Sequence, residues 1–168
     1  MSIGGKTIAT LHLICGLPCS GKTTLAKQIE KERSALRLTP DEWITRLFGA
    51  DLSVEALDAA RDPVEAALWD VAARVLVLGV DVVLDFGFWS SGEREEFRGR
   101  AMQLGAGSEL HFLEVPEEVL ITRLAARNAQ LPQGTFWIDE ARLRLWSSWF
   151  EPPTEEELRP RDPSGSAL

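Results

Sequence analysis

The stretch Gly16-Leu-Pro-Cys-Ser-Gly-Lys-Thr23 decides the fold. Its pattern, Gly-x-x-x-x-Gly-Lys-Thr, is the phosphate-binding loop known as Walker A, or P-loop. Gly16 and Gly21 permit backbone conformations that a side chain would forbid, so that successive N–H groups can turn inward around a polyphosphate. Lys22 supplies a mobile positive charge, and the Thr23 hydroxyl can bind Mg²⁺. The stretch therefore predicts a loop that binds a nucleotide.

The residues on either side of the loop support this interpretation. Residues 8–15 form an apolar run typical of a buried parallel strand. After the loop, Leu25, Ala26 and Ile29 recur at helical spacing, and this helix directs its positive dipole end at the same anion. We assign the nucleotide contacts to Gly16, Cys19, Ser20, Gly21, Lys22, Thr23 and Thr24.

The rest of the chain alternates strands with helices. The predicted strands span residues 8–15, 34–38, 80–86 and 109–115. The predicted helices after the first span residues 41–48, 62–79, 90–105, 116–128 and 139–150. Asp62 and Pro63 read as the N-cap and first residue of the second of these, and residues 54–61 form a separate short helical stretch. This alternation predicts an α/β protein with a parallel sheet and helices on both faces, the three-layer arrangement of P-loop NTPases.

The length of 168 residues suits one domain with a substantial core. We place a P-loop domain at residues 1–153, with a lid around 123–137, and expect residues 154–168 to form a polar, flexible tail.

Composition argues for a cytoplasmic protein. The chain has no apolar run of about 20 residues that could span a membrane, and residues 1–6 do not begin a signal peptide. Cys15 and Cys19 lie too close together to form a disulfide framework, which fits a reducing compartment. The net charge of −8 weighs against a long nucleic-acid partner, because such partners favour basic surfaces.

Two aspartates fall at predicted carboxyl ends of strands, where ligands of parallel sheets bind. Asp85 ends the apolar strand 80–86, so that it can hold Mg²⁺ opposite Thr23; the alternative is a carboxylate that caps a turn. Asp41 follows the second strand and can act as the base that activates an attacking hydroxyl. Its alternative role is a helix N-cap after Pro40.

Arginines provide candidates for the stabilisation of phosphate charge. Arg123 and Arg127 lie four residues apart on one helix face and precede a flexible loop, so both could close over the phosphates. The alternative is a solvated surface that pairs with Glu117 and Glu118. Arg46 and Arg94 are weaker candidates for contacts to the substrate or to the phosphates.

Aromatic side chains near the expected strand ends could line an acceptor pocket, and Trp43, Phe88 and Trp89 are candidates together with Arg46. Packing in the core is the alternative for Phe88 and Trp89. His12 and His111 sit inside predicted strands, and we interpret both as packing residues. Because Cys and His do not occur at metal-ligand spacing, the sequence predicts no structural zinc site.

These features together resemble small P-loop kinases of the zeta-toxin, chloramphenicol phosphotransferase and polynucleotide-kinase-like group, which are often described as AAA-type ATP-binding proteins. The resemblance covers about residues 8–150. It rests on the P-loop, on Asp41, on Asp85-Phe-Gly-Phe-Trp89 and on Arg123-Leu-Ala-Ala-Arg-Asn128. Such relatives bind ATP, or in some cases GTP, with Mg²⁺, and their sheets commonly have five strands in the order 2-3-1-4-5.

The resemblance implies a role for each matching position. Gly21 and Lys22 would contact nucleotide phosphates, Thr23 would bind Mg²⁺, Asp41 would activate the acceptor, and Arg123 or Arg127 would be the lid arginine.

Two departures limit the resemblance. Polynucleotide kinases carry an arginine three residues after the catalytic aspartate, whereas this chain has Ile44 there and Arg46 later. A fifth strand is also not evident after the lid, and residues 151–154 could supply the base site in its place.

The leading hypothesis is an enzyme that transfers the γ-phosphoryl group of ATP to a hydroxyl of a small metabolite or antibiotic. Three alternatives remain: a 5′-hydroxyl polynucleotide kinase, a toxin with kinase activity, and a nucleotide-dependent switch with little turnover. The sequence identifies neither the acceptor nor the oligomeric state.

Overall fold

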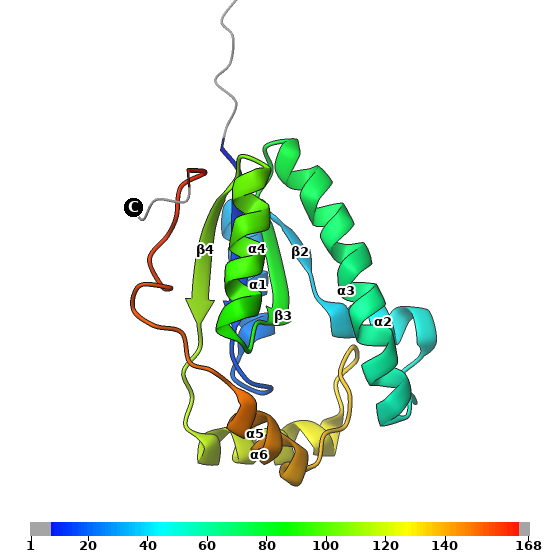
Figure 1. Ribbon diagram of the computed structural model, residues 1–168. Coiled ribbons are helices and arrows are strands. Elements are labelled where there is room, and N and C mark those ends of the chain that lie inside the picture. Colours follow the sequence, from blue (N-terminus) through cyan, green and yellow to red (C-terminus); the bar gives the residue numbers. More distant parts are fainter. Residues whose placement is uncertain (1–7, 165–168) are drawn as a thin grey trace, which may run out of the picture.

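A four-stranded parallel sheet forms the centre of the molecule (Figure 1). The computed structural model describes residues 8–164. The strands are β1 (Thr10–Cys15), β2 (Leu36–Leu38), β3 (Val82–Gly87) and β4 (Gly107–Phe112), in the order β2-β3-β1-β4. β1 lies at the centre, where Leu13 pairs with Leu84 of β3 and Leu110 of β4. The predicted α/β fold with a parallel sheet is confirmed, with four strands in the described residues.

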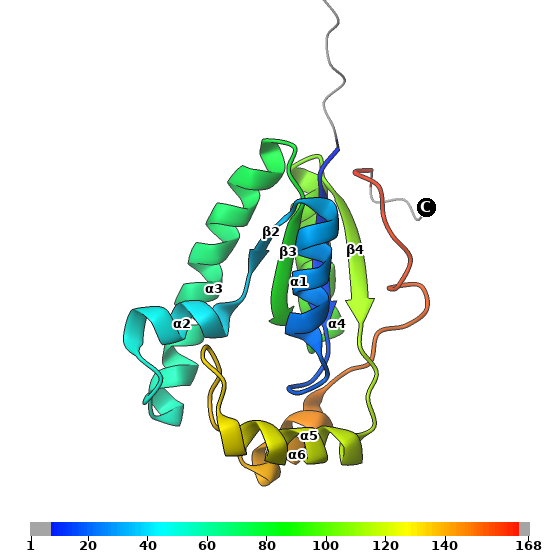
Figure 2. The ribbon, with the colours of Figure 1, turned by 180° about the vertical axis from the view of Figure 1, so that it is seen from behind.

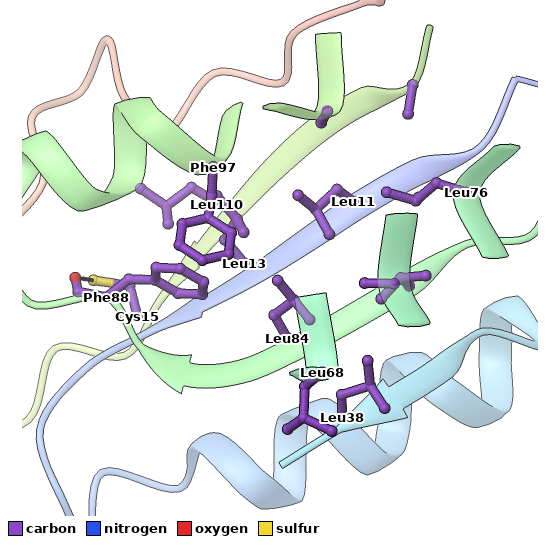
Figure 3. Close-up of a cluster of buried hydrophobic side chains, with 14 of the residues drawn as sticks. Leu11, Leu13, Cys15, Leu38, Leu68, Leu76, Leu84, Phe88, Phe97 and Leu110 are labelled. Atoms are coloured by element: carbon purple, nitrogen blue, oxygen red, sulfur yellow. Dashed lines mark hydrogen bonds between the residues drawn. The ribbon is translucent and has the colours of Figure 1, made fainter. Parts of the chain in front are cut away.

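Helices cover both faces of this sheet. α1 (Lys22–Arg33) lies on one face, as seen in Figure 2, and packs Ala26 and Ile29 against Ile14 and Val83. α3 (Val54–Val77) and α4 (Ser91–Gln103) lie on the other face. Their apolar side chains pack against β1, β3 and β4 in the main core (Figure 3), which includes Leu11, Leu13, Leu68, Leu76, Leu84, Phe97 and Leu110.

Three further helices lie towards the carboxyl ends of the strands. α2 (Pro40–Phe48) packs against α3, whereas α5 (Glu117–Gln130) and α6 (Glu140–Trp149) pack against each other (Figure 1). Leu120, Leu124 and Leu143 form a separate small core between α5 and α6. The side of the molecule where parallel sheets bind ligands therefore has its own layer of helices.

The start of α3 differs from the sequence prediction. The helix does not begin at Asp62 but at Val54, with Ser53 as its N-cap accepting a hydrogen bond from the Ala56 N–H. Pro63 lies inside the helix, where it removes one hydrogen bond. Leu57 and Ala60 pack against the main core, and this burial favours a continuous helix.

The C-terminal segment also differs from the expected flexible tail. Up to residue 164 it packs against the domain, and residues 165–168, like residues 1–7, lie outside the described part of the chain. Ser108 and Arg161 exchange two backbone hydrogen bonds of 2.9 Å in an antiparallel bridge beside β4. The polar composition of the segment does not predict this packing, because composition does not reveal that Glu157 pairs with a charged side chain in the interior.

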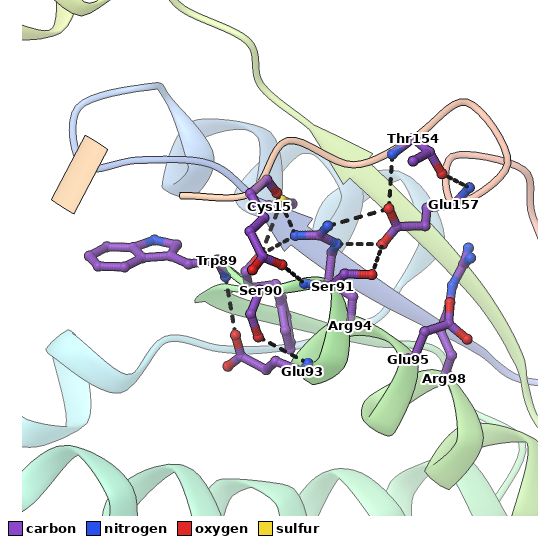
Figure 4. Close-up of polar contacts among 12 residues, drawn as sticks. Cys15, Trp89, Ser90, Ser91, Glu93, Arg94, Glu95, Arg98, Thr154 and Glu157 are labelled. Atoms are coloured by element: carbon purple, nitrogen blue, oxygen red, sulfur yellow. Dashed lines mark hydrogen bonds and ion pairs between the residues drawn. The ribbon is translucent and has the colours of Figure 1, made fainter. Parts of the chain in front are cut away.

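That interior charge is Arg94 of α4. It is 1% exposed, and its Nε donates to Glu157 at 2.8 Å (Figure 4). Its remaining nitrogens donate to Glu157 and to the backbone carbonyls of Phe88 and Glu151. The ion pair fixes the C-terminal segment, so Arg94 does not serve as the phosphate ligand considered from the sequence.

Candidate active site

Two glycines of the P-loop adopt positive φ angles that residues with side chains rarely adopt. Gly16 has φ +152°, and a β-carbon there would lie 2.8 Å from the Ser20 hydroxyl oxygen. The Gly16 N–H donates to the carbonyl of Gly87 at 3.0 Å, which ties the loop to the end of β3. Gly21 is the N-cap of α1 in the left-handed region, with φ 101°. These two glycines let the chain turn back directly above the sheet.

The polar groups of this loop fit a polyphosphate. Gly21 offers no side chain to cap α1, so the N–H groups of the first turn are left for an anion. Cys19 also has a positive φ, 65°, and such reversals make concave groups of N–H donors. The Ser20 hydroxyl is buried without a hydrogen-bond partner.

Lys22 lies over its own loop. Its ammonium donates to the Leu17 carbonyl at 2.7 Å. Burial lowers the pKa of Lys22, and the negative charges of Asp85 and Asp41 act in the opposite direction. Both aspartates that the sequence singled out therefore act on this ammonium, and a phosphate could replace the carbonyl as its partner.

Thr23 and Asp85 are the two groups suited to Mg²⁺. The Thr23 hydroxyl donates to Asp85 Oδ2 at 2.7 Å, and the Thr39 hydroxyl donates to the same oxygen at 3.2 Å. Asp85 is 6% exposed, and burial raises its pKa. Two oxygens at this separation suit neighbouring positions around Mg²⁺, whose ligands lie about 2.0–2.1 Å from the ion. The chemistry of this donor pair fits the cofactor expected from the sequence.

Asp41 lies in the first turn of α2, and Arg61 of α3 donates a hydrogen bond of 2.7 Å to its Oδ1. The N-cap of α2 is Thr39, so the alternative role of Asp41 as N-cap is wrong. In addition to the effects of burial, the charge of Asp41 acts to raise the pKa of both Lys22 and Asp85. It remains partly open to solvent.

Arg61 is a residue that the sequence analysis missed. It was assigned to a stretch outside the main helix because that helix was expected to begin at Asp62. In the continuous α3, Arg61 also lies 3.4 Å from Glu65, one turn later. Burial raises the pKa of Glu65 to about 7, and nearby Glu93 adds to this effect. The i,i+4 spacing of Arg61 and Glu65 was the signal that could have indicated a helix through Pro63.

The two candidate lid arginines have different positions. Arg123 is exposed, and one guanidinium nitrogen lies 3.3 Å and 3.5 Å from the carbonyls of Cys19 and Ser20 in the P-loop. Arg127 instead donates to the carbonyl of Phe136 at 3.0 Å, and its Nε is buried without a partner. The structure brings Arg123, and not Arg127, to the loop.

The segment 131–139, which we call the lid loop, leaves α5 and reaches towards α2 (Figure 1). Asn128 anchors its far end, because the side chain donates to the carbonyl of Ile138 and accepts from its N–H. Where the loop approaches α2, a β-carbon added to Gly134 would lie 3.3 Å from Glu42 Cγ. The lid loop therefore touches the residue next to Asp41.

The proposed acceptor residues are dispersed. Phe88 is 1% exposed and stacks on Phe86 in the core, so it does not line a pocket. The position of Phe88 just after β3 did not indicate that its side chain packs in the core. Trp89 packs against Trp146 of α6, with ring centroids 5.4 Å apart. Trp43 is 41% exposed on α2. Arg46, on the same helix, is also exposed.

A cavity of about 210 Å³ lies between the P-loop, the end of β4 and α6. It is lined by Leu17, Phe112, Leu113, Glu114, Val115, Leu120, Ser147, Phe150 and Pro152. Its walls are largely aromatic and aliphatic, which suits a flat ring.

Comparison with known proteins agrees with this geometry. Residues 11–153 match the family described as "AAA domain". None of the curated proteins compared with the chain matches it. Within residues 8–164, no helix has the length and apolar character that crossing a membrane requires.

Solved structures share the fold at low identity. A chain of the Pnkp1/Rnl/Hen1 RNA repair complex matches 99% of this chain, with 18% identity and a TM-score of 0.70; the match covers 52% of that longer chain. Chaetomium thermophilum Kti12 in complex with ADP-AlF3 has 20% identity, a TM-score of 0.64 and coverage of 87% and 82%. A gluconokinase from Sinorhizobium meliloti 1021 has 20% identity, a TM-score of 0.55 and coverage of 90% and 79%. The protein thus spans about half the length of the first matched chain.

Proposed function

This chain belongs to the AAA-domain family, and on that premise we propose that it is a P-loop kinase that transfers the γ-phosphoryl group of ATP to a hydroxyl group of a small molecule, either a metabolite or an antibiotic. The observation that carries the proposal is the position of Asp41. A carboxylate held by Arg61 lies in the first turn of the helix that follows β2, at the same edge of the sheet as the P-loop, and its charge acts on the P-loop lysine. Nucleotide binding alone would need no base there.

The phosphates would lie in the P-loop. The N–H groups at the start of α1 and the Lys22 ammonium would bind their oxygens, and Lys22 would exchange the Leu17 carbonyl for the anion. Thr23 and Asp85 would hold Mg²⁺, which when bound neutralises phosphate charge.

Asp41 would act on the acceptor. Its Oδ1 is fixed by Arg61, so the carboxylate is oriented before the substrate arrives. As the acceptor oxygen forms its bond to the γ-phosphorus, the bond from that phosphorus to the β–γ bridging oxygen breaks and ADP leaves. The proton of the acceptor hydroxyl passes to Asp41.

Arg123 would stabilise the charge that develops on the transferred group. Its guanidinium already contacts the carbonyls of the P-loop, so a small rotation of the side chain would direct it to the phosphates. The contact of the lid loop with α2 supports a site that excludes water around the reacting atoms.

The cavity beside Leu17, Phe150 and Pro152 is our candidate for the nucleotide base. Pro152 in its wall belongs to residues 151–154, which the sequence indicated as a base site in place of a fifth strand. Apolar walls would accept adenine or guanine by stacking, so ATP and GTP both remain candidates. We include a cytoplasmic location in the proposal, because ATP, Mg²⁺ and the unpaired thiols of Cys15 and Cys19 coexist there.

A 5′-hydroxyl polynucleotide kinase is the second candidate. The fold match to a chain of an RNA repair complex over 99% of this protein favours it. The acidic net charge and the contact of Gly134 with α2 favour a small acceptor instead, because a nucleic-acid strand needs a basic and open path.

The test is ATP consumption with Mg²⁺ against an acceptor panel of nucleosides, sugars, aminoglycosides, phenicols, macrolides and 5′-hydroxyl oligonucleotides. We expect one small acceptor to stimulate turnover in the wild type and no stimulation in Lys22→Ala. Stimulation by the oligonucleotides alone would replace the small-acceptor proposal with the second candidate. Tight ATP binding without stimulated turnover would favour a nucleotide-dependent switch.

A further inference from the structure

The only two histidines of the chain meet on the face of the sheet that α1 covers. His12 belongs to β1 and His111 to β4, and the parallel register pairs His12 with Glu109. Because side chains alternate along a strand, residues 109 and 111 share a face, and His12 shares its face with Ile14, which packs under α1. Residues 99 positions apart are thus brought together.

Three potential ligand atoms form a compact triangle here. His12 Nδ1 lies 3.0 Å from His111 Nε2 and 3.3 Å from Glu109 Oε2. His111 Nε2 lies 3.8 Å from the same carboxylate oxygen. In tetrahedral zinc sites the ligand atoms lie about 2.0–2.1 Å from the metal, so pairs of ligands are roughly 3.4 Å apart. The three separations lie around that value.

The second nitrogen of His12 is also arranged as in a metal site. His12 is 1% exposed, and its Nε2 is buried without a hydrogen-bond partner. Asp81 Oδ2 lies 3.7 Å away, while Asp81 Oδ1 accepts from the Thr10 N–H at 2.8 Å. Metal-binding histidines usually direct their other nitrogen at a carboxylate or carbonyl, which fixes the ring. A cation bound at Nδ1 would account for the position of His12 Nε2 opposite the Asp81 carboxylate.

We propose that His12, Glu109 and His111 bind one late first-row divalent cation of the Zn²⁺ class, with Asp81 orienting the His12 ring. Two imidazoles and one carboxylate suit Zn²⁺ and not Mg²⁺, which prefers oxygen ligands. His111 and Glu109 have side chains that are 23% and 30% exposed, so the cation would enter from their side and keep water as its fourth ligand.

The cation would link the central strand to the edge strand β4. Arg33, in the last turn of α1, is a positive charge that acts on both histidines and opposes a cation, and the carboxylates of Glu109 and Asp81 offset it. This site lies on the strands themselves and does not use Lys22, Thr23 or Asp85. Its test is therefore independent of the kinase proposal.

The test uses tag-free full-length protein, titrated with Zn²⁺ in competition with a chelating dye and with excess Mg²⁺ present. We expect one Zn²⁺ per chain at micromolar free metal. His111→Ala and Glu109→Gln should each weaken binding by about tenfold or more, and Asp81→Asn by about 10–100-fold. Cys19→Ser and Asp85→Asn are matched controls for the thiol and for the Mg²⁺ site, and they should bind as the wild type does.

Two spectroscopic readouts locate the metal. Because the chain has only two histidines, both imidazole ¹⁵N signals should shift on saturation with Zn²⁺. Co²⁺ in place of Zn²⁺ should give the visible absorption of a tetrahedral site. At a hundredfold excess over Kd, Zn²⁺ should raise the unfolding midpoint of the wild type by roughly 5 °C or more.

Three results would overturn the proposal: failure of the wild type to bind Zn²⁺ at micromolar concentration, equal binding by His111→Ala, or loss of binding in Cys19→Ser alone. His12 is not used for the decisive variant because its burial makes unfolding a competing explanation. The partly exposed positions 109 and 111 avoid that problem, and circular dichroism of both variants checks their fold.

Discussion

Arg61 of α3 donates a 2.7 Å hydrogen bond to Asp41 of α2, although twenty positions separate the two residues. Glu65, one turn further along α3, shares the same guanidinium. The packing of α2 against α3 therefore supplies both the position and the partner of the proposed base.

Arg61→Ala should lower kcat by about a hundredfold, because misplacement of a reacting group by 1 Å costs roughly that factor. The KM for ATP should change little, since Arg61 contacts Asp41 and not the P-loop. Arg74→Ala is a matched control, an exposed arginine near the end of the same helix, and should retain wild-type kinetics. An equal effect of both substitutions would contradict the positioning role.

Substitution of Arg123 should affect catalysis, whereas substitution of Arg127 should affect stability. Arg123→Ala should lower kcat by about 10²–10³ with little change in stability, because it removes an exposed side chain aimed at the P-loop. Arg127→Ala should instead lower the free energy of unfolding by about 1–3 kcal/mol, since it leaves the carbonyl of Phe136 without its donor. Steady-state kinetics and urea unfolding measure the two effects. The reverse assignment would show that the wrong arginine faces the phosphates.

The ion pair of Arg94 and Glu157 should be a major contribution to stability. Glu157→Ala leaves a buried guanidinium uncompensated, and we expect a loss of about 3–5 kcal/mol in the free energy of unfolding. Glu155→Ala, an exposed neighbour, is the control and should change stability little. Similar unfolding curves for the two variants would mean that the C-terminal segment contributes little to the fold.

The same pair predicts a pH dependence. Hydrogen bonding to Arg94 lowers the pKa of Glu157 to about 2, from an ordinary value of 4.5. The stabilisation is therefore present above pH 4.5 and is lost as the pH falls towards 2. Urea unfolding at pH 6 and pH 3 should show a smaller loss in Glu157→Gln than in the wild type. Equal losses would assign acid sensitivity to other carboxylates.

Glu65 should give the opposite dependence. Burial raises its pKa to about 7, so between pH 4.5 and 7 the folded state retains a proton that the unfolded state releases. Stability from this group is present below pH 4.5 and falls as the pH rises through 7. Glu65→Gln should remove this decline. Thermal unfolding at pH 5 and pH 8 measures it, and an unchanged decline in the variant would exclude Glu65 as its source.

Local sequence signals predicted most of the fold. The P-loop pattern, the apolar strands and the helix start near residue 90 depend on neighbours within a few residues. The structure has each of them, and Ser90 caps α4 by accepting a hydrogen bond from the Glu93 N–H. The break expected at Pro63 failed because burial of Leu57 and Ala60 favoured a continuous helix, which one local rule could not weigh.

The site was predictable only in part. Thr23 and Asp85 lie within hydrogen-bond distance, as expected when the strand ends of a parallel sheet converge at one edge, and their role in Mg²⁺ binding stays a prediction. The partners Arg61 with Asp41 and Arg94 with Glu157 depend on how helices and the C-terminal segment pack, and no spacing rule contains that information. The contact between His12 and His111 could be predicted only with knowledge of the register of β4 against β1.

The most direct test of the central claim is transfer of labelled γ-phosphate from ATP to the acceptor found by the panel, in the wild type and in Asp41→Asn. The account predicts that Asp41→Asn binds ATP as the wild type does and transfers phosphate about 10²–10⁴-fold more slowly. Transfer by Asp41→Asn at the wild-type rate would contradict Asp41 as the base.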